Sequence, residues 1–436
     1  MTPTVPEAIA RIEARQPLIR AFVSTRLPEA RADHQARAAE KPRSPLHGVP
    51  FGLKDEWETL CLPTTGGSWR HRARRSPVDS PVMRVLDEAG AVLMGKTNLS
   101  DYGLVPESSS LVGGDTRNPH DLGRTAGGSS GGAAAAVADG MVGFDWGTDI
   151  GGSIRLPAGN CGVYGLRLSA ERWPLTGYFP TAPPSMTWLL GQGPIARSLA
   201  DVRAVLAVAA PLATGPARPR FTAREALLYT VHSGGMWPGF SAEVAGPLRR
   251  AGLAVRESML SPPAKARWIY NGVWCSHLED LLAGEPDLTL LTGLGAVLSA
   301  VTLRGRLGDR RFHPTAAEIL LQVAVGRLVF RDKRRALADA QAYRDDFERI
   351  WERGGVVVMP VCVWPAAKIG ASNRNPRILE CTMPGNLADA TGLAVPWGRF
   401  SDGLPRGIQL LGPPGSEDEL IALAERLAPG TSSAPA

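Results

Sequence analysis

The chain contains little lysine, few cysteines and no export signal. Six of its 48 basic residues are lysines, so 42 are arginines. Its five cysteines have no metal-binding spacing and leave one unpaired, which indicates a reducing compartment rather than a disulfide framework. The first residues lack the basic and apolar segments of a signal peptide. We therefore expect a cytoplasmic protein with no metal site and no cofactor.

The positive charge of the chain is dispersed. The net charge is +6, and the densest basic cluster, residues 70–75, has no interleaved aromatic side chains. Such a cluster is typical of a solvated loop, so we expect no nucleic-acid partner. The 436 residues are 44% hydrophobic and 21% charged, which is the composition of a globular protein with a large core.

One apolar stretch is too short to predict a membrane span. Leu288 to Leu303 carries no charged side chain over sixteen residues, whereas a spanning helix needs about 20. Two interpretations stay open, a core helix and a hydrophobic cap that touches a membrane. Neither predicts a stable span.

Two Gly-Gly-Ser elements, at 127–129 and 151–153, lie in a segment rich in small residues, 123–165. Glycine has no Cβ, so the backbone can approach a substrate closely and aim consecutive N–H groups at a developing negative charge. The segment therefore predicts an oxyanion site beside two serine hydroxyls.

A serine nucleophile needs a base at neutral pH. The seven histidines lie mostly in polar or arginine-rich surroundings, which are typical of surface or structural histidines. Lys54 and Lys96 instead lie in apolar segments that contain glycine. In a chain that otherwise uses arginine, such a lysine suggests a role that requires losing a proton, and burial favours that loss. For each lysine, the other interpretation is an ammonium group in solvent.

Six segments follow one another along the chain in the order of a known motif series. They read LHGVPFGLKD (46–55), GKTNLSDYG (95–103), GRTAGGSSGG (123–132), GTDIGGSIRLPAGNCGVYGLR (147–167), GPIARSLAD (193–201) and GLPRGIQLLGPP (403–414). Together they resemble the motifs of the amidase signature family. The resemblance covers most of the chain, and six motifs in the right order are far more specific than any single one.

The resemblance implies a Ser-Ser-Lys triad. Ser153 would be the nucleophile, Ser129 a bridging serine that follows a cis peptide bond, and Lys54 the base. All three side chains are present, which argues against a scaffold protein without catalysis. In the implied reaction, Lys54 draws a proton from Ser129, and Ser129 draws one from Ser153 as it attacks an amide carbonyl.

The same motifs imply supporting residues around the nucleophile. The oxyanion hole would be formed by the backbone N–H groups of Ile150, Gly151 and Gly152, together with that of Ser153. We expect the residues that orient this turn to be Ser130, Asp149 and Arg155. Lys96 matches a regular motif position at which a structural hydrogen-bonding role is expected.

The substrate residues are expected between the motifs. By position, Tyr102, Gly103 and Leu104 would line the acyl pocket, and Trp188 would contribute an apolar wall. The resemblance is nearest to the fatty-acid-amide-hydrolase-like branch, which favours a hydrophobic acyl or aryl amide as the substrate. Two other activities stay open: a glutaminase component of an amidotransferase complex, and a biosynthetic acyl transferase that uses the same acyl-enzyme. A homodimer also stays open.

Three rival motifs predict other chemistry less well. Residues 90–97 satisfy the phosphate-loop expression, but their apolar centre is typical of a buried strand. Gly127-x-Ser129-x-Gly131 matches a nucleophile elbow, but no strand clearly precedes it. Cys161 lacks a nearby histidine or cation, so a packing role is the default.

Alternating apolar patterns predict a layered α/β fold. Strands are expected at 49–53, 91–94 and 357–363, and helices at 5–41, 78–89, 131–138 and 330–353. The resemblance implies one mixed sheet of many strands, covered on both faces by helices. We expect a single domain over residues 1–428, with a variable specificity region at 215–345, and a disordered tail at 429–436.

Overall fold

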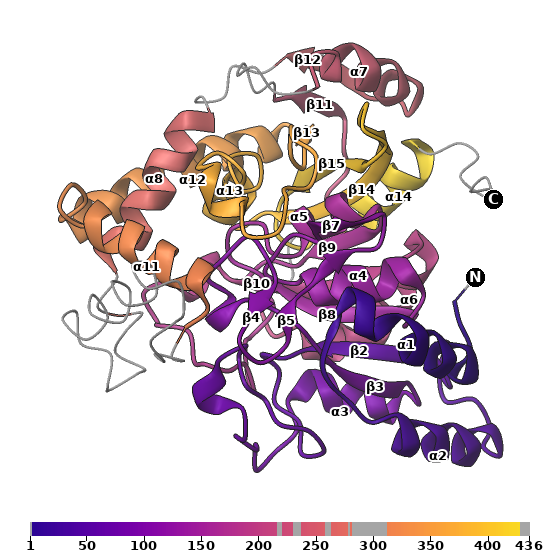
Figure 1. The fold of residues 1–436 in the computed structure, drawn as a ribbon. Helices are drawn as coiled ribbons and strands as arrows, with labels where there is room; N and C mark the ends of the chain where they lie inside the picture. The colour runs from indigo at the N-terminus through magenta and orange to yellow at the C-terminus, as the bar shows by residue number, and fades with distance from the viewer. Residues whose placement is uncertain are drawn as a thin grey trace.

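Eleven strands form one mixed β-sheet that runs through the molecule (Figure 1). The structure is a computed structural model that describes residues 2–215, 220–229, 237–257, 263–277, 280 and 312–427. The strands of the sheet are β1 (Phe22–Thr25), β2 (Pro50–Lys54), β3 (Val92–Thr97), β8 (Phe144–Asp149), β9 (Tyr164–Arg167), β10 (Gly191–Ala196), β11 (Glu225–Leu228), β12 (Ala254–Glu257), β13 (Gly355–Pro360), β14 (Thr391–Arg399) and β15 (Pro405–Gly412). Their spatial order is β1-β3-β2-β8-β10-β9-β14-β15-β13-β11-β12.

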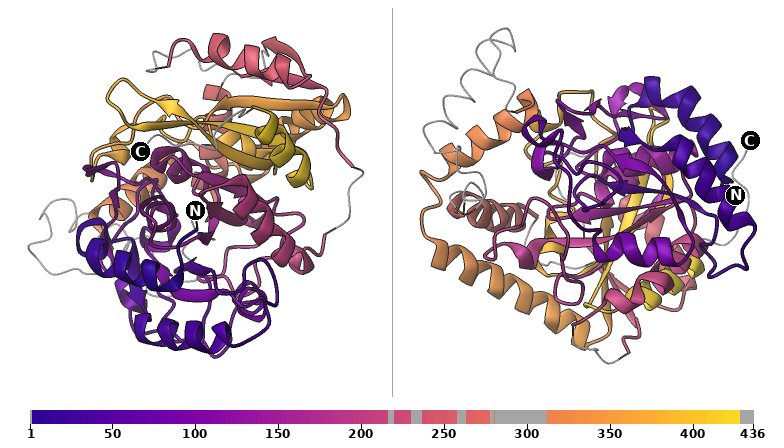
Figure 2. Two further views of the ribbon diagram at one scale, coloured as in Figure 1. Left: turned by 90° about the vertical axis from the view of Figure 1, so that its right-hand side faces the viewer. Right: turned by 90° about the horizontal axis from the view of Figure 1, so that it is seen from below.

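Two parallel groups flank an antiparallel centre in this sheet. Strands β3, β2 and β8 run parallel to one another at one end, and β13, β11 and β12 do so at the other. The strands between them pair antiparallel. The N-terminal segment and helix α7 (Phe240–Arg250) accordingly lie at opposite ends of the molecule (Figure 2).

Helices cover both faces of the sheet. Alternate residues of β14 belong to different cores, since Leu393 and Val395 pack in one hydrophobic cluster and Ala394 packs in another. Successive side chains of a strand point to opposite faces, so the two clusters mark the two faces. One cluster includes residues of α1 (Val5–Ile19), α2 (Leu27–Ala38), α4 (Gly131–Asp139) and α5 (Arg155–Cys161). The other includes residues of α3 (Pro81–Glu88), α6 (Leu199–Ala209), α7 and α14 (Glu417–Leu427).

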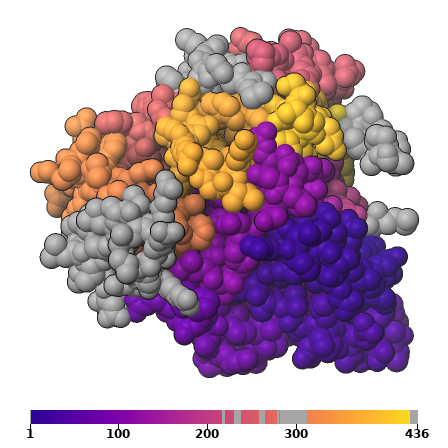
Figure 3. Space-filling model, viewed as in Figure 1, coloured from indigo at the N-terminus to yellow at the C-terminus, as the bar shows by residue number. Residues whose placement is uncertain are grey.

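A further group of helices packs beside the C-terminal strands. It consists of α8 (Pro263–Ser276), α11 (Pro314–Gly326), α12 (Lys333–Glu352) and α13 (Met383–Leu387). Helix α8 contacts the other three. Figure 3 shows this orange part of the chain in contact with the magenta and indigo N-terminal part.

Short elements complete the chain between these parts. Two small sheets pair β4 (Ser109–Ser110) with β5 (Gly114–Asp115) and β6 (Arg117–Asn118) with β7 (Asp121–Thr125). The 3-10 turns are η1 (Trp69–His71), η2 (Asp101–Gly103), η3 (Thr187–Leu189), η4 (Ala210–Leu212) and η5 (Ser372–Arg374).

The structure confirms most of the expected elements and corrects one. The α/β fold with a large mixed sheet is confirmed, and the predicted strands and helices correspond to β2, β3, β13, α3, α4 and α12. A purely helical 5–41 is wrong, because Arg20 ends α1 in the left-handed conformation at φ 57° and Phe22–Thr25 forms edge strand β1. Its Phe-Val-Ser-Thr sequence has the aromatic and β-branched residues that favour a strand.

Some expectations fall outside the described residues. Leu288–Leu303 and the tail 429–436 belong to the segments that the structure does not describe. Within the described ranges, none of the helices is long and apolar enough to cross a membrane. The domain limits and the specificity region at 215–345 stay predictions.

Candidate active site

Lys54 is the last residue of β2 and lies between two parallel neighbours. In open α/β sheets, ligands bind at the carboxyl ends of parallel strands, and β2 and β8 both end here. The Lys54 side chain is completely buried. Its Nζ lies 2.7 Å from Ser129 Oγ and 2.7 Å from Thr148 Oγ1 of β8. The structure thus brings together two of the three predicted triad residues.

A carboxylate also contacts Lys54. Glu56 Oε2 lies 2.9 Å from Lys54 Nζ, and the Thr148 hydroxyl donates to the same oxygen at 2.7 Å. Burial lowers the pKa of Lys54 from its ordinary value, although the charge of Glu56 acts in the opposite direction. The lowered pKa favours the neutral amine that a base requires.

Ser129 lies at the start of α4, directly after a cis peptide bond. The bond is Gly128–Ser129, as the resemblance implied. Gly128 is needed there, because a Cβ would lie 2.3 Å from the backbone nitrogen of Glu107. The Ser108 hydroxyl donates to the Ser129 carbonyl oxygen at 2.7 Å and accepts from the Gly131 amide at 2.7 Å. Close packing and a hydroxyl bridge therefore fix this turn.

Ser153 lies in the turn between β8 and α5. It is 7% exposed and lines a pocket, and its carbonyl oxygen accepts a hydrogen bond from the Ser130 amide at 3.1 Å. The Ser130 hydroxyl donates to the Thr148 carbonyl oxygen at 3.2 Å. Through these two bonds Ser130 joins the Ser153 turn and β8 to α4, which is the supporting position expected of it.

Asp149 organises the Ser153 turn from within. Its carboxylate accepts hydrogen bonds from the Gly152, Ile154 and Arg155 amides at 2.8–3.3 Å, and the Arg155 guanidinium donates two more. Burial by itself raises the pKa of Asp149, but the Arg155 and Arg167 guanidiniums outweigh it and hold the pKa well below its usual range. Asp149 therefore stays charged and acts as an orienting group.

This network changes the expected oxyanion hole. The Gly152 amide, expected to be one of its donors, already donates to Asp149 Oδ1 at 2.8 Å. The amides of Ile150, Gly151 and Ser153 remain the candidate donors. Residues from two other helices hold this part of the turn, since Tyr270 donates to the Ile150 carbonyl oxygen at 3.1 Å and Thr382 donates to that of Gly151 at 2.6 Å.

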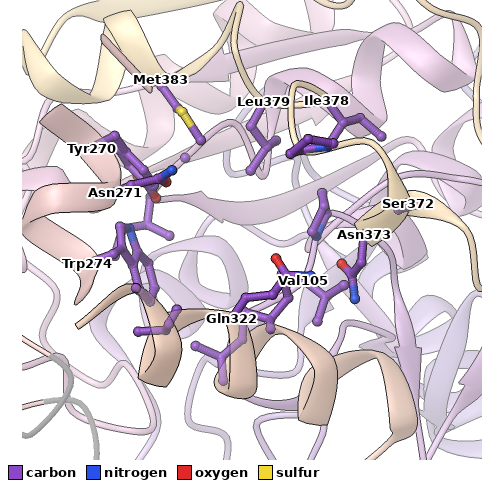
Figure 4. A pocket seen from close by; sticks show the side chains of 18 of the residues that line it. Val105, Tyr270, Asn271, Trp274, Gln322, Ser372, Asn373, Ile378, Leu379 and Met383 are labelled. Atoms are coloured by element: carbon purple, nitrogen blue, oxygen red, sulfur yellow. The ribbon is translucent and has the colours of Figure 1, made fainter. Parts of the chain in front are cut away.

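Two pockets open beside the two serines. The Ser153 pocket is lined by Ser153, by residues of α8 and α11, and by the segment 372–379 (Figure 4). Its empty volume, including the space at its open mouth, is about 1040 Å³. The Ser129 pocket is lined by Ser129, Glu56 and Tyr178 among others. Leu104 and Ile150 line both pockets, so the two adjoin.

Three of the four expected substrate residues line these pockets. Gly103 and Leu104 line both, and Tyr102 lines the Ser129 pocket. Trp188 lines neither. It packs in a hydrophobic cluster, donates its Nε1–H to the Ser185 carbonyl oxygen at 3.0 Å and lies under the Arg344 guanidinium. Its assignment as a pocket wall is therefore wrong.

The rival motifs have structural roles. Lys96 is buried in β3 and contacts Asp55 at 3.1 Å and the Trp57 carbonyl oxygen at 2.6 Å. Cys161 is buried, and burial raises the pKa of its thiol. No cluster of three or more histidine, cysteine or acidic residues that could hold a metal occurs in the ranges described.

The sequence interpretation missed several residues at the site. Glu56, Thr148, Tyr270 and Thr382 all contact the predicted triad or its turn. A signal existed for Glu56, because it follows Lys54 by two residues and side chains alternate along an extended strand. Tyr270 and Thr382 come from distant helices, so no local pattern could indicate them.

Comparisons with known proteins agree with this geometry. A family model described as Amidase matches residues 4–219 and 240–421. A putative amidase named AmiB2 from Mycobacterium bovis is 32% identical over 438 residues, which cover 96% of this chain and 90% of the relative. A glutamyl-tRNA(Gln) amidotransferase component from Chloroflexus aggregans is 31% identical over 456 residues, which cover 96% of this chain and 90% of that relative.

A solved structure extends the likeness to the fold. The peptide amidase of Stenotrophomonas maltophilia superposes with a TM-score of 0.74 at 26% identity, covering 97% of this chain and 92% of the other. Sequence, fold and site thus agree. The chain belongs to the amidase signature family and is a hydrolase that acts on amide carbon–nitrogen bonds.

Proposed function

We propose that the protein hydrolyses a hydrophobic acyl or aryl amide through an acyl-enzyme on Ser153, with Ser129 and Lys54 as the proton relay. The observation that carries the proposal is the 2.7 Å contact between the fully buried Lys54 Nζ and Ser129 Oγ, beside a pocket lined by Ser153. A buried amine in contact with a hydroxyl is the arrangement that base catalysis through a serine requires.

The reaction follows from the positions of these groups. Neutral Lys54 takes the Ser129 proton while Ser129 takes the Ser153 proton, and Ser153 Oγ attacks the amide carbon. The negative charge on the carbonyl oxygen is then stabilised by turn amides from Ile150, Gly151 and Ser153. The relay runs in reverse to protonate the leaving nitrogen, so the C–N bond breaks and an ester on Ser153 remains. Water attacks that ester by the same relay and releases the acid.

The pocket composition supports an apolar substrate. The described residues that line the Ser153 pocket include Val105, Trp274, Ile378 and Leu379, and none of them carries a charged side chain. An apolar acyl chain or ring gains free energy by leaving water in such a pocket, at about 25 cal/mol per Å² of buried surface. Polar groups such as Asn271 and Gln322 are few and can orient the amide.

The glutaminase alternative draws support from the 31% identity to an amidotransferase component. Glutamine carries an ammonium and a carboxylate, and both need charged or strongly polar partners when they leave water. The uncharged lining of the Ser153 pocket argues against this substrate. Glutamine turnover together with a co-purifying partner would restore the alternative.

A fluorophosphonate probe tests the nucleophile without knowledge of the substrate. We expect peptide mass spectrometry to find the label on Ser153 in the wild type and none in Ser153→Ala. Ser276→Ala is the matched control, since it removes a buried hydroxyl whose neighbours are the Val273 carbonyl oxygen and the His277 ring, outside the triad. A Ser153→Ala variant that is labelled as fast as wild type would remove the proposal.

Labelled protein then permits a screen of amides that differ in acyl length. Hydrolysis is read as released acid and amine, and rates should rise with apolar acyl size until the pocket is filled. Hydroxylamine added to the same assay separates transfer from hydrolysis, because an acyl transferase would form mainly the hydroxamate.

A further inference from the structure

The hydrogen bonds around Lys54 are organised by an acidic residue. Lys54 Nζ has three oxygen neighbours, namely Ser129 Oγ at 2.7 Å, Thr148 Oγ1 at 2.7 Å and Glu56 Oε2 at 2.9 Å. The Thr148 hydroxyl also donates to Glu56 Oε2 at 2.7 Å. Lysine, threonine and glutamate therefore form a closed triangle, and only Ser129 leads out of it toward Ser153.

The carboxylate fixes the direction of each bond in this triangle. An ionised carboxylate only accepts hydrogen bonds, so the Thr148 hydroxyl must point at Glu56. Thr148 Oγ1 can then accept from Lys54 but has no proton left to donate to it. When Lys54 is neutral, its two N–H groups are directed to Glu56 and Thr148. Its lone pair is therefore left facing Ser129, which is the orientation that a base needs.

We propose that Glu56 is a positioning residue of the relay, which aims the neutral Lys54 amine at Ser129 and is the counter-ion of the ammonium that forms when Lys54 takes the proton. The inference rests on the proposed function. Glu56 would act on Lys54 as the buried aspartate of a Ser-His-Asp triad acts on its histidine. It does not touch the reacting bond, and the proton moves only between Ser153, Ser129 and Lys54.

The surroundings of the triangle strengthen the assignment. The Glu56 side chain is 1% exposed, so water does not screen its charge. Gly103 contributes to this fit, because a Cβ there would lie 2.6 Å from Glu56 Oε1. The second carboxylate oxygen has the Tyr178 hydroxyl at 3.4 Å. Glu56 is thus held between the relay and the wall of the Ser129 pocket.

Other charged groups near Lys54 are already accounted for. Asp149 of β8 is paired with Arg155 at 2.9 Å. Asp145, also on β8, has its pKa raised by burial to about 8. Both act on Lys54 in the wild type and in any Glu56 variant alike, so they cancel in the comparison between the two.

The test measures the rate of fluorophosphonate labelling of Ser153 against pH in the full-length protein. Glu56→Gln keeps the size of the side chain and removes its charge. We expect the rate at the high-pH plateau to fall about tenfold or more, because the lone pair is no longer directed. We also expect the acid limb to move to lower pH by about one unit or more, because an opposite charge that raised the Lys54 pKa is lost. The deficit is therefore smallest at low pH.

Asp55→Asn is the matched control. Asp55 is the neighbouring residue, is also buried and also contacts a buried lysine, Lys96, at 3.1 Å. It lies outside the relay, so the acid limb should stay where it is in the wild type. A purely structural role for Glu56 would lower the melting temperature and leave the pH profile unchanged.

Glu56→Asp keeps the test decisive if Glu56→Gln does not fold. It retains the charge and withdraws the carboxylate by one methylene, so we expect an unmoved acid limb and a lower plateau. Wild-type plateau and limb in Glu56→Gln, equal limb shifts in Glu56→Gln and Asp55→Asn, or a full plateau in Glu56→Asp would each overturn the inference. Absence of labelling in the wild type would remove the proposed function, and this inference with it.

Discussion

Lys54 and Lys96 lie on neighbouring parallel strands, and both are completely buried, yet only one of them contacts a serine of the predicted triad. In the register of β2 and β3, Lys54 lies beside Thr97 and Lys96 lies beside Leu53. Neighbouring positions of a strand face opposite ways, so the two side chains point to opposite faces of the sheet. Two consecutive acids follow the same alternation, since Glu56 contacts Lys54 and Asp55 contacts Lys96.

The comparison separates a perturbed pKa from a functional role. Burial lowers the pKa of both lysines, and a carboxylate opposes that effect in each case. The difference lies in the remaining contacts. Lys54 contacts the hydroxyls of Ser129 and Thr148, whereas Lys96 contacts the Trp57 carbonyl oxygen and the Thr64 hydroxyl. Geometry toward a nucleophile therefore distinguishes them, while the direction of the pKa shift does not.

The largest expected effect is on labelling by the fluorophosphonate probe. Lys54→Met should lower the rate of Ser153 labelling between about 10³- and 10⁴-fold, because a positioned base contributes about 10²–10⁴ and its loss also leaves Glu56 unpaired. Lys96→Met is the control with the same substitution, and its folded fraction should label within about threefold of wild type. Equal losses in the two variants would mean that burial, and not the contact with Ser129, makes a lysine important here.

Stability should not distinguish the two lysines. Removing one partner of a buried ion pair costs about 3 to 5 kcal/mol, so Lys96→Met and Lys54→Met should both lower the free energy of unfolding by about this amount. Denaturant unfolding followed by tryptophan fluorescence measures it. A loss below about 1 kcal/mol in Lys96→Met would show that the Lys96–Asp55 pair is not needed, and the structural role given to Lys96 would fall.

The difference between the lysines also marks what could be read from the sequence. Six ordered motifs identified the fold, the two serines and Lys54, because these residues lie in continuous segments. The alternation of side chains in β2 could have assigned Glu56 to Lys54. Tyr270 and Thr382 could not be assigned, because they meet the Ser153 turn only after α8 and α13 have packed. Trp188 was misassigned because its position in the chain did not reveal that it packs under Arg344.

The pH dependence of labelling should report Lys54 alone. Its pKa is lowered by burial, so the neutral amine becomes the main form at a pH below the ordinary lysine value of about 10.4. The labelling rate should therefore rise with pH and level off below that value. The profile of Lys96→Met should coincide with that of the wild type. A rate that keeps rising beyond about pH 10.4 would mean that the base is not a buried lysine.

The smallest expected effect comes from the two threonines that contact the lysines. Thr148→Val and Thr64→Val each remove one hydroxyl that lies 2.7 or 2.9 Å from a lysine Nζ. A hydrogen bond to a charged group contributes about 1.5 to 3 kcal/mol, so both variants should unfold at lower denaturant concentration. Only Thr148→Val should also slow the labelling of Ser153, by about tenfold, because one of the two acceptors that orient the Lys54 amine is lost. If Thr64→Val slows labelling as much, the relay extends through the sheet to Lys96, and the two lysines act as one unit.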